Sequence, residues 1–465
     1  MKVLCFAFFL LLTLPVQGQE QAENLTLEAC INYAMNNSET IKNAQLDREI
    51  ARTDVNVTKA QGLPQVNGSV NYQNGVRPFI VPPGSFGAPS GGAGGGTGGN
   101  GGGANGGTAN DDPQALALGL DNSFDATVQA TQLLFDGSYF IGLRAAKVYA
   151  ELTTKDYELT RANVTEAVTK AYYGALISEE RLSLLKKSKS RLDTLLYETR
   201  MLYENGFAES IDVDRLQVQA NNTQVRLNQT ERALETSYLL LKFQMGMSLD
   251  KEINLAGDLS EISLSPDLKQ DIDFQYSDRM EYSKLNTNQR LAELDIKNNV
   301  WQHLPRLNAS FTYGYTSGSF DFETVANFGA DYTLYGLSLS VPVFDGFLKH
   351  NRIQKNKIQL QQLENAKTQL ARNIDIEIVQ ARSTLETSIE DLEVQEKNVE
   401  LANRVLETAR IKYAEGVGSN LEVVTAQTEY EEAETNYYSS LYDALIARVE
   451  LDKALGRLAP EPETE

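Results

Sequence analysis

The chain has 465 residues, with 42 Lys and Arg against 63 Asp and Glu, and a net charge of −21. This length allows two or three globular domains. The acidic balance argues against a protein that tracks nucleic-acid phosphates, because such a protein needs clustered positive charge. Two cysteines, Cys5 and Cys30, and two histidines are too few for a disulfide framework or a Cys/His metal cluster. We therefore expect no metal and no cofactor.

Residues 1–18 have the pattern of a secretory signal peptide. Lys2 provides the positive start, an apolar run extends from Leu4 to Leu14, and Val16-Gln17-Gly18 forms the cleavage site. The apolar run is about 11 residues long, whereas a membrane-spanning helix needs about 20. No later apolar stretch is long enough to cross a bilayer as a helix. We therefore expect membrane contact only through β-strands or at the surface.

The second half of the chain repeats the first. Three motif pairs recur at an offset of 209 or 210 residues, which indicates a duplication. These pairs are Leu134-Phe135-Asp136-Gly137 with Val343-Phe344-Asp345-Gly346, Tyr203-Glu204-Asn205-Gly206 with Tyr413-Ala414-Glu415-Gly416, and Met245-Gly246 with Leu455-Gly456. The expected repeats are residues 19–260 and 261–456, followed by an acidic, proline-containing tail at 457–465.

Each repeat begins with a helix of about 25 residues that ends before a Leu-Pro pair, because proline stops helical geometry. Two strands with strict alternation of apolar and polar residues follow. They are expected at about 64–76 and 121–135 in the first repeat, and at about 306–316 and 332–344 in the second. Since one side of each strand is apolar and rich in aromatic residues, the pattern predicts a sheet with one apolar face.

Very long helical hairpins follow the strands, at 138–245 and 347–455. Their first helices have about 66 residues, which would extend about 100 Å. In the second repeat, apolar residues recur every seven positions, as in a coiled-coil seam. The series is Ile378, Leu385, Leu392, Val399, Leu406 and Tyr413.

Four strands of about ten residues each suit a membrane-spanning sheet, since a transmembrane strand needs 9–11 residues. Four strands cannot close into a barrel, however, and an open edge in lipid leaves backbone groups without partners. Known barrels begin at about 8 strands, so several chains would have to pool their strands. A soluble sandwich with aromatic core faces remains the alternative interpretation of the same pattern.

The ordered pair of repeats resembles the TolC-like outer-membrane efflux proteins. The resemblance covers nearly the whole chain after the signal segment and includes the opening Leu25-Thr26-Leu27-Glu28-Ala29. It implies a mainly α protein with a membrane β part. In such a protein, four strands per chain join a 12-stranded trimeric β-barrel, above a long α-helical coiled-coil tunnel and a small mixed α/β equatorial region.

The same resemblance implies the function, the location and the partners. Such a protein is the outer-membrane exit duct of a tripartite efflux pump or a type I secretion system in a Gram-negative bacterium, with a periplasmic helical extension. It works as a homotrimer in outer-membrane lipid. It docks on a periplasmic adaptor, or membrane fusion protein, and on an inner-membrane transporter of the RND or ABC type. It is not an enzyme, and the transported substrate and pump class stay open.

The resemblance also assigns roles to residues near the hairpin tips. Asn205, Gly206, Gly416 and Gly418 would contact the adaptor, and Asp212, Glu422 and Tyr413 would form the channel constriction or gate. Each position has a simpler interpretation. Glycine ends a helix by adopting a positive φ. Glu422 completes a capping box, and Asp212 favours a helix N-terminus. Tyr413 could serve only as a packing residue.

A second function class fits part of the sequence. A structural or adhesive periplasmic coiled coil with a small β cap would explain the heptads and the acidity. It does not explain why two strand pairs interrupt the helices at equivalent points of a duplication. The channel is therefore the better interpretation.

Glycine is concentrated in one segment: 14 of the 33 glycines lie between Gly84 and Gly107. The segment falls inside the first strand pair, where the second repeat has a much shorter connection. A nearly uncharged, glycine-rich segment cannot bury enough surface to fold. With the hairpin tips in the periplasm, we expect an extracellular loop at 84–112.

Overall fold

The structure is a computed structural model that describes residues 23–75, 79–81, 116–118, 122–257, 259, 274–319, 321–325 and 329–458. The expected signal segment, the glycine-rich loop at 84–112 and the tail beyond residue 458 lie outside the described residues. The expected repeat boundary at residues 260 and 261 lies outside them too.

The chain divides into two compact units. The helical unit comprises Met1–Thr53, Lys147–Glu293 and Ile358–Glu465, and the sheet unit comprises Asp54–Ala146 and Leu294–Lys357. Each unit takes segments from both halves of the duplication. The repeats are therefore repeats of sequence and local structure, and neither is a compact unit by itself.

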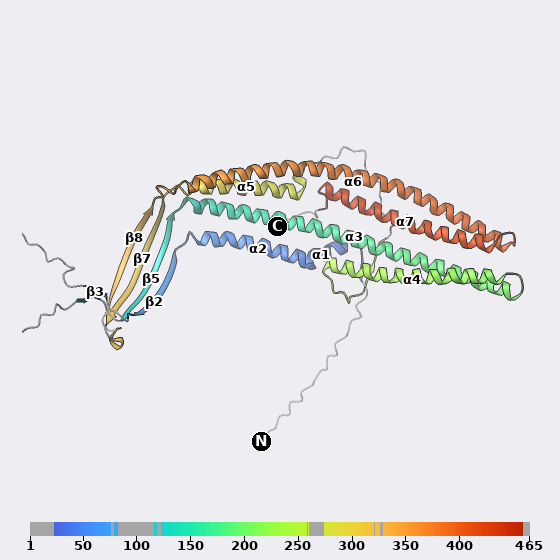
Figure 1. Ribbon diagram of the computed structural model, residues 1–465, viewed down its shortest axis with the longest axis horizontal. Helices are drawn as coiled ribbons and strands as arrows, with labels where there is room; N and C mark the ends of the chain where they lie inside the picture. Colours follow the sequence, from blue (N-terminus) through green and yellow to red (C-terminus); the bar gives the residue numbers. More distant parts are fainter. Residues whose placement is uncertain are drawn as a thin grey trace, which may run out of the picture. The chain divides into compact units, whose positions relative to one another are not determined.

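The sheet unit contains a four-stranded antiparallel sheet in the order β2-β5-β7-β8 (Figure 1). The strands are β2 (Gln65–Asn74), β5 (Asn122–Phe135), β7 (Arg306–Ser319) and β8 (Gly329–Ser340). A short antiparallel pair, β3 (Phe79–Val81) and β4 (Leu116–Leu118), and the 3-10 turn η3 (Phe322–Thr324) lie between them in sequence. β8 ends four residues before the expected boundary at 344, because Pro342 has no N–H to offer a ladder.

The strand register places the apolar residues on one face of this sheet. Phe311 of β7 lies opposite Ala130 of β5 on one side and Tyr335 of β8 on the other, and Ala130 in turn faces Val66 of β2. Asn67, one residue along β2, belongs to the opposite, polar face. The structure therefore has the predicted sheet with one apolar side.

This apolar face is exposed. All ten residues of β2 are solvent-accessible, and in β8 the side chains of Leu337 and Tyr335 are 74% and 83% exposed. Val66 and Val70 of β2 are 65% and 69% exposed. A contiguous exposed apolar face of this kind marks a surface that meets protein or lipid.

Two long helical hairpins dominate the helical unit (Figure 1). The first hairpin consists of α3 (Gly137–Glu204) and α4 (Ser210–Met245), and the second of α6 (Leu348–Ala414) and α7 (Asn420–Ala454). The tips and ends of the two hairpins repeat at the offset seen in the sequence, since α4 begins at residue 210 and α7 at residue 420. No helix in the described residues is both long and apolar enough to cross a membrane.

Shorter elements complete the chain. They are α1 (Leu27–Asn37), α2 (Glu39–Ala60), α5 (Met280–Trp301), the 3-10 turn η2 (Tyr276–Asp278), and the parallel pair of β1 (Glu23–Leu25) with β6 (Ile253–Leu255). Thr26 caps α1 by accepting a hydrogen bond from the N–H of Ala29 at 3.3 Å. Cys30 of α1 is fully buried among apolar residues, and this burial raises the pKa of its thiol to about 11.

The seven-residue series of the second repeat lies along the buried side of α6. Leu385 and Leu406 are 0% and 1% exposed, and Ile378, Leu392 and Tyr413 are half-buried against clusters that include α7 residues. Burying a leucine side chain contributes about 2 kcal/mol. The heptad pattern thus predicted the packing side of this helix correctly.

Two glycines with positive φ allow a matched test of backbone strain. Gly456 has φ +72°, and an added Cβ would lie 2.5 Å from the carbonyl oxygen of Asp278, whereas Gly206 has φ +80° and open space around it. We expect Gly206→Ala to lower the free energy of unfolding by about 1 kcal/mol, the cost of a left-handed alanine. Gly456→Ala should cost about 2 kcal/mol or more because the Asp278 backbone must also move. Urea unfolding followed by circular dichroism would compare them, and equal losses would contradict the close approach.

Candidate functional site

The tips of the two hairpins are built alike. At the first tip, Gly206 has φ +80° and the N–H of Phe207 donates to the carbonyl oxygen of Leu202 at 2.8 Å. At the second, Gly416 has φ +74° and the N–H of Val417 donates to the carbonyl oxygen of Lys412 at 3.0 Å. A glycine in the left-handed region with this bond is a common way to end a helix.

Gly418 corrects part of the sequence interpretation, because it has no positive φ. Glycine is required here because Gly418 lies close to the end of α6. An added Cβ would lie 2.8 Å from the Cβ of Lys412 and 3.0 Å from the backbone nitrogen of Tyr413. A larger residue there would push the tip away from the end of α6. Asn205, at the first tip, donates its Nδ2 to the carbonyl oxygen of Met201 at 2.7 Å.

Each tip carries an exposed apolar residue directly after its left-handed glycine. Phe207 is 81% exposed and Val417 is 79% exposed. Large apolar side chains at the end of a hairpin contribute nothing to the core in this position. They are suited to contact with another protein.

Side chains join the two hairpins near their tips. The hydroxyl groups of Thr199 on α3 and Tyr413 on α6 are 3.3 Å apart. The buried Asn420 at the start of α7 donates its Nδ2 to the carbonyl oxygen of Asp212 at 3.0 Å. Further along, Gln219 on α4 donates to Thr428 on α7 at 3.3 Å. Tyr413 therefore links the first hairpin to the second.

The two acidic candidates have different surroundings. Asp212 is half-buried in the first turn of α4, and its carboxylate lies 3.9 Å from the guanidinium of Arg215. Glu422 is exposed in the first turn of α7, where its N–H donates to the hydroxyl of Ser419 at 3.2 Å. The Ser419 side chain thus caps α7, which is one half of the capping box expected at Glu422.

The Glu422 side chain lines a surface groove of about 690 Å³ between α6 and α7. We call this the α6/α7 groove. Its floor is largely apolar and includes Val405 and Leu421, while Arg404 provides positive charge at its side. The surroundings of Glu422 are therefore not purely acidic.

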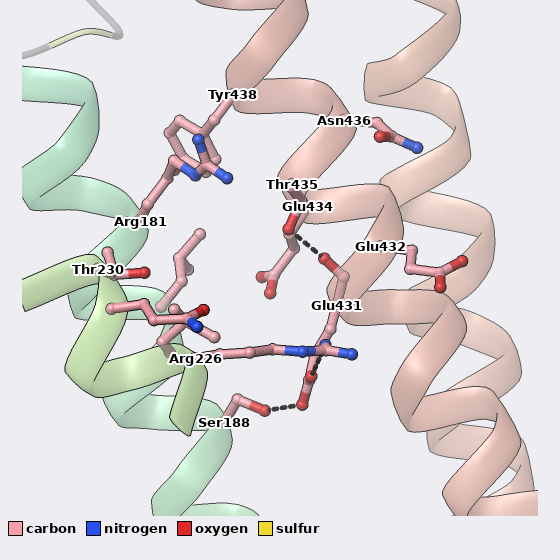
Figure 2. Close-up of a pocket in the computed structure, with 13 residues that line it drawn as sticks. Arg181, Ser188, Arg226, Thr230, Glu431, Glu432, Glu434, Thr435, Asn436 and Tyr438 are labelled. Atoms are coloured by element: carbon pink, nitrogen blue, oxygen red, sulfur yellow. Dashed lines mark hydrogen bonds and ion pairs between the residues drawn. The ribbon is translucent and has the colours of Figure 1, made fainter. Parts of the chain in front are cut away.

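A buried polar cluster joins both hairpins further from the tips, and the sequence reasoning missed it. Glu431 of α7, which is 4% exposed, accepts hydrogen bonds from Ser188 of α3 and from Arg226 of α4 at 3.3 Å (Figure 2). It also accepts one from Gln427 of α7 at 3.1 Å. Gln427 also donates to the Ser188 hydroxyl at 2.8 Å. We call these four residues the charged cluster, and it borders a cavity of about 420 Å³.

A signal for this cluster exists in the sequence. Gln427 and Glu431 follow the buried Val423 at successive steps of four residues, so polar residues occupy the stripe that should be apolar. Buried polar groups at such positions need partners. The partners could not be named from the sequence, because they lie more than 200 residues away.

Glu434 lies three residues beyond Glu431 and is 8% exposed. Burial raises the pKa of its carboxyl above the ordinary value of 4.5, and the nearby Glu431 acts in the same direction. A hydrogen bond from Tyr430 and the positive charges of Arg191 and Lys187 oppose this shift only in part.

The raised pKa of Glu434 gives a stability that depends on pH. Because the folded carboxyl holds its proton more tightly than the unfolded one, the native state binds more protons, and stability falls as the pH rises above 4.5. Glu434→Gln should remove this loss and make the chain more stable than wild type at neutral pH. Unfolding midpoints measured across this pH range would check it, with the exposed Glu432→Gln as control. A less stable variant at neutral pH would contradict the sign.

The described residues contain no group of three or more His, Cys, Asp or Glu that could hold a metal ion. His303 has its Nδ1 3.1 Å from the carbonyl oxygen of Val300 and stands apart from the tips in sequence. The site is a set of joined helical tips beside a surface groove.

Paired helical hairpins joined at their tips, together with a sheet that exposes an apolar face, define a channel-type outer-membrane protein. The chain matches the family described as outer membrane efflux protein over residues 100–247 and 282–457. The chain belongs to this family. It is an exit duct of the outer membrane, and proteins of the family work with adaptors and inner-membrane transporters.

Relatives and solved structures agree with this assignment. The chain is 21% identical over 339 residues to outer membrane protein TolC of Vibrio cholerae, covering 72% of this chain and 77% of that protein. It is 22% identical to the alkaline protease secretion protein AprF of Pseudomonas aeruginosa, covering 70% of this chain and 68% of that one. The fold matches the CmeC outer membrane channel of Campylobacter jejuni with a TM-score of 0.70 and 17% identity, covering 94% and 87% of the two chains.

Proposed function

We propose that three copies of the chain pool their sheets into one 12-stranded outer-membrane barrel. The observation that carries this proposal is the four-stranded sheet with an exposed apolar face. Among the residues that the structure describes, its outer strands β2 and β8 each pair on one side only. In lipid, unpaired strand edges are costly, and four strands are too few to close by themselves. Pairing β8 of one copy with β2 of the next would satisfy both edges.

In this proposal the helical hairpins continue as a coiled-coil tunnel through the periplasm. The tips at Asn205, Gly206, Gly416 and Gly418 contact a periplasmic adaptor, which connects the duct to an RND or ABC transporter of the inner membrane. The exposed Phe207 and Val417 support this role, since they offer apolar contacts where a partner would arrive. The duct conducts small molecules or a secreted polypeptide passively, as the names of relatives such as AprF suggest.

The gate in this proposal lies at the joined tips. Three copies each of Asp212 and Glu422 would place rings of negative charge at the entrance, where they attract cations. The contact between Thr199 and Tyr413 would hold the hairpins in the closed arrangement. Opening the duct then requires this contact to separate.

The experiment that tests the duct uses the full protein extracted from outer membranes in detergent. We expect a trimer by light scattering, resistance of this trimer to sodium dodecyl sulfate until it is heated, and ion conductance in planar lipid bilayers. A detergent-free, soluble monomer without conductance would overturn the proposal and favour the structural coiled coil instead.

Removing the Tyr413 hydroxyl should increase conductance. Tyr413→Phe loses the contact with Thr199, which contributes about 1 kcal/mol per chain to the closed arrangement. The fraction of time that the channel is open should therefore rise several-fold. Tyr203→Phe, at the equivalent and more exposed position of the first tip, is the matched control and should leave conductance unchanged. Equal behaviour of the two variants would exclude Tyr413 from the gate.

A further inference from the structure

The cavity beside the charged cluster is bordered by three helices of one chain, and we call it the seam cavity. Its lining residues recur at steps of three and four, so one stripe of each helix faces it. The stripes run from Arg181 to Ser188 on α3, from Arg226 to Thr230 on α4 and from Glu431 to Tyr438 on α7. The volume of about 420 Å³ lies within the range of small-molecule sites, about 300–1,000 Å³.

The lining of the seam cavity is polar, although the facing sides of packed helices are ordinarily apolar. Apart from Leu184 and Leu185, the side chains that line it carry hydroxyl, amide or charged groups. A purely apolar ligand would leave these groups without partners, which costs free energy. The lining therefore favours a polar ligand.

Both signs of charge are present in this lining. Three of its side chains are carboxylates and two are guanidiniums; they are Glu431, Glu432 and Glu434, and Arg181 and Arg226. A ligand with only negative charge would meet the three carboxylates, and a ligand with only positive charge would meet the two guanidiniums. A zwitterion can place each of its charges beside the opposite charge of the protein.

The guanidinium that is open to a ligand belongs to Arg181. Arg226 already forms an ion pair with Glu431 at 3.3 Å. Arg181 is exposed at the cavity and has no ion-pair partner among the residues that the structure describes. A guanidinium accommodates a carboxylate through two parallel hydrogen bonds. Arg181 is therefore suited to the negative end of a ligand.

The carboxylate that is suited to the positive end belongs to Glu434. In Figure 2 its side chain extends from α7 toward the first hairpin, into the space that the cavity occupies. The side chain is 8% exposed, and burial raises its pKa, a shift that Arg191 and Lys187 of α3 offset only in part. An ammonium group in the cavity would supply the missing positive charge and favour the ionised carboxylate.

The separation of the two groups indicates the length of the ligand. Arg181 lies on α3 and Glu434 on α7, and the axes of packed helices are about 8–10 Å apart. Two extended residues of a peptide span about 7 Å. The ammonium and carboxylate at the two ends of a dipeptide are therefore spaced to reach partners on facing helices.

We propose that the seam cavity binds a small zwitterion of the dipeptide class, with its carboxylate on Arg181 and its ammonium on Glu434. The amide of Gln229 and the hydroxyl of Thr230 on α4 are available to the peptide group and polar side chains of the ligand. All of these contacts come from one chain. The site therefore does not depend on the trimer of the proposed function.

Isothermal titration calorimetry of the full protein, extracted from outer membranes in detergent at neutral pH, tests the site. L-alanyl-L-glutamine should bind saturably, with one molecule per chain. Its N-acetyl form lacks the ammonium and its C-terminal amide lacks the carboxylate. Each blocked form should bind about tenfold more weakly, because one charged contact is lost.

Two variants assign the ends of the ligand. Arg181→Gln should weaken binding of the dipeptide about tenfold and leave the weaker binding of its C-terminal amide unchanged. Glu434→Gln should weaken binding of the dipeptide to the same degree and leave that of the N-acetyl form unchanged. Arg232→Gln and Glu235→Gln, at exposed positions of α4 outside the lining, are the matched controls and should bind like wild type. Circular dichroism would confirm that each variant is folded.

Each opposite result would overturn the proposal. If the N-acetyl form or the C-terminal amide binds as well as the dipeptide, the ligand is not recognised as a zwitterion. If Arg181→Gln and Glu434→Gln bind like the controls, the dipeptide does not occupy the seam cavity. Absence of saturable binding at millimolar dipeptide would exclude the site, while a trimer observed in the same preparation would leave the proposed duct standing.

Discussion

Arg279→Met is expected to destabilise the helical unit by about 3 kcal/mol. Arg279 is 6% exposed and stands between the end of η2 and the start of α5. Its guanidinium donates to Glu281 at 3.1 Å, to Glu377 of α6 at 3.1 Å and to the carbonyl oxygen of Ala454 at the end of α7 at 3.0 Å. Methionine fills a similar volume and can make none of these bonds, so three segments lose their common partner.

The pH dependence of this variant follows from Glu281. Burial alone would raise the pKa of its carboxyl, but the hydrogen bond and charge of Arg279 hold it below the ordinary value of 4.5. A depressed folded pKa contributes stability above that ordinary value, and the contribution is lost as the pH falls through the folded value. The difference between wild type and Arg279→Met should therefore shrink in acid.

Urea unfolding followed by circular dichroism at neutral and acidic pH would measure both effects. Arg290→Met is the matched control, since Arg290 is half exposed and pairs with Glu151 at the surface. An exposed pair contributes less than about 1 kcal/mol. Equal losses for the two variants would show that Arg279 does not hold the segments together.

Glu431→Ala is expected to lower stability by about 3 kcal/mol and to raise conductance. The substitution leaves the buried Ser188 hydroxyl without its acceptor, removes one of the two acceptors of Gln427 and removes the counter-charge of Arg226. The two hairpins of each chain then lose a buried polar contact away from the tips. If separation of the hairpins opens the duct, as proposed, the open state becomes more stable relative to the closed state.

The neighbouring Glu432 provides the control for this prediction. It is exposed on the same helix and has the same charge, so Glu432→Ala should change stability by no more than about 0.5 kcal/mol. Denaturant unfolding and bilayer conductance of both variants would check the result. A stable Glu431→Ala protein with wild-type conductance would exclude the charged cluster from both roles.

Much of the fold could be predicted from residues that follow a period. Alternation in Phe311, Tyr313 and their neighbours predicted the strands and the apolar face. The register places Phe311 opposite Ala130 and Tyr335, and Tyr313 opposite Val128. The seven-residue series through Leu385 and Leu406 gave the buried side of α6. Such patterns are local, because a helix or strand that buries one face needs apolar residues at its own period.

The candidate site was predictable only in part. Gly206 and Gly416 end their helices with positive φ, as the turn pattern indicated. Gly418 is glycine for a different reason: it lies close to Lys412, and this closeness depends on where the backbone of α6 lies. The charged cluster joins residues from three helices, and no local spacing connects Ser188 or Arg226 with Glu431.

The sequence by itself determined the duplication, the order of strands and helices, the positions of the tips and the family. These properties arise from periodic burial and from glycine and proline geometry, which act over a few residues. The tertiary structure alone decided which side of each hairpin is covered and which polar residues are partners. Those choices depend on contacts between segments about 200 residues apart, where packing and desolvation, rather than local spacing, select the partner.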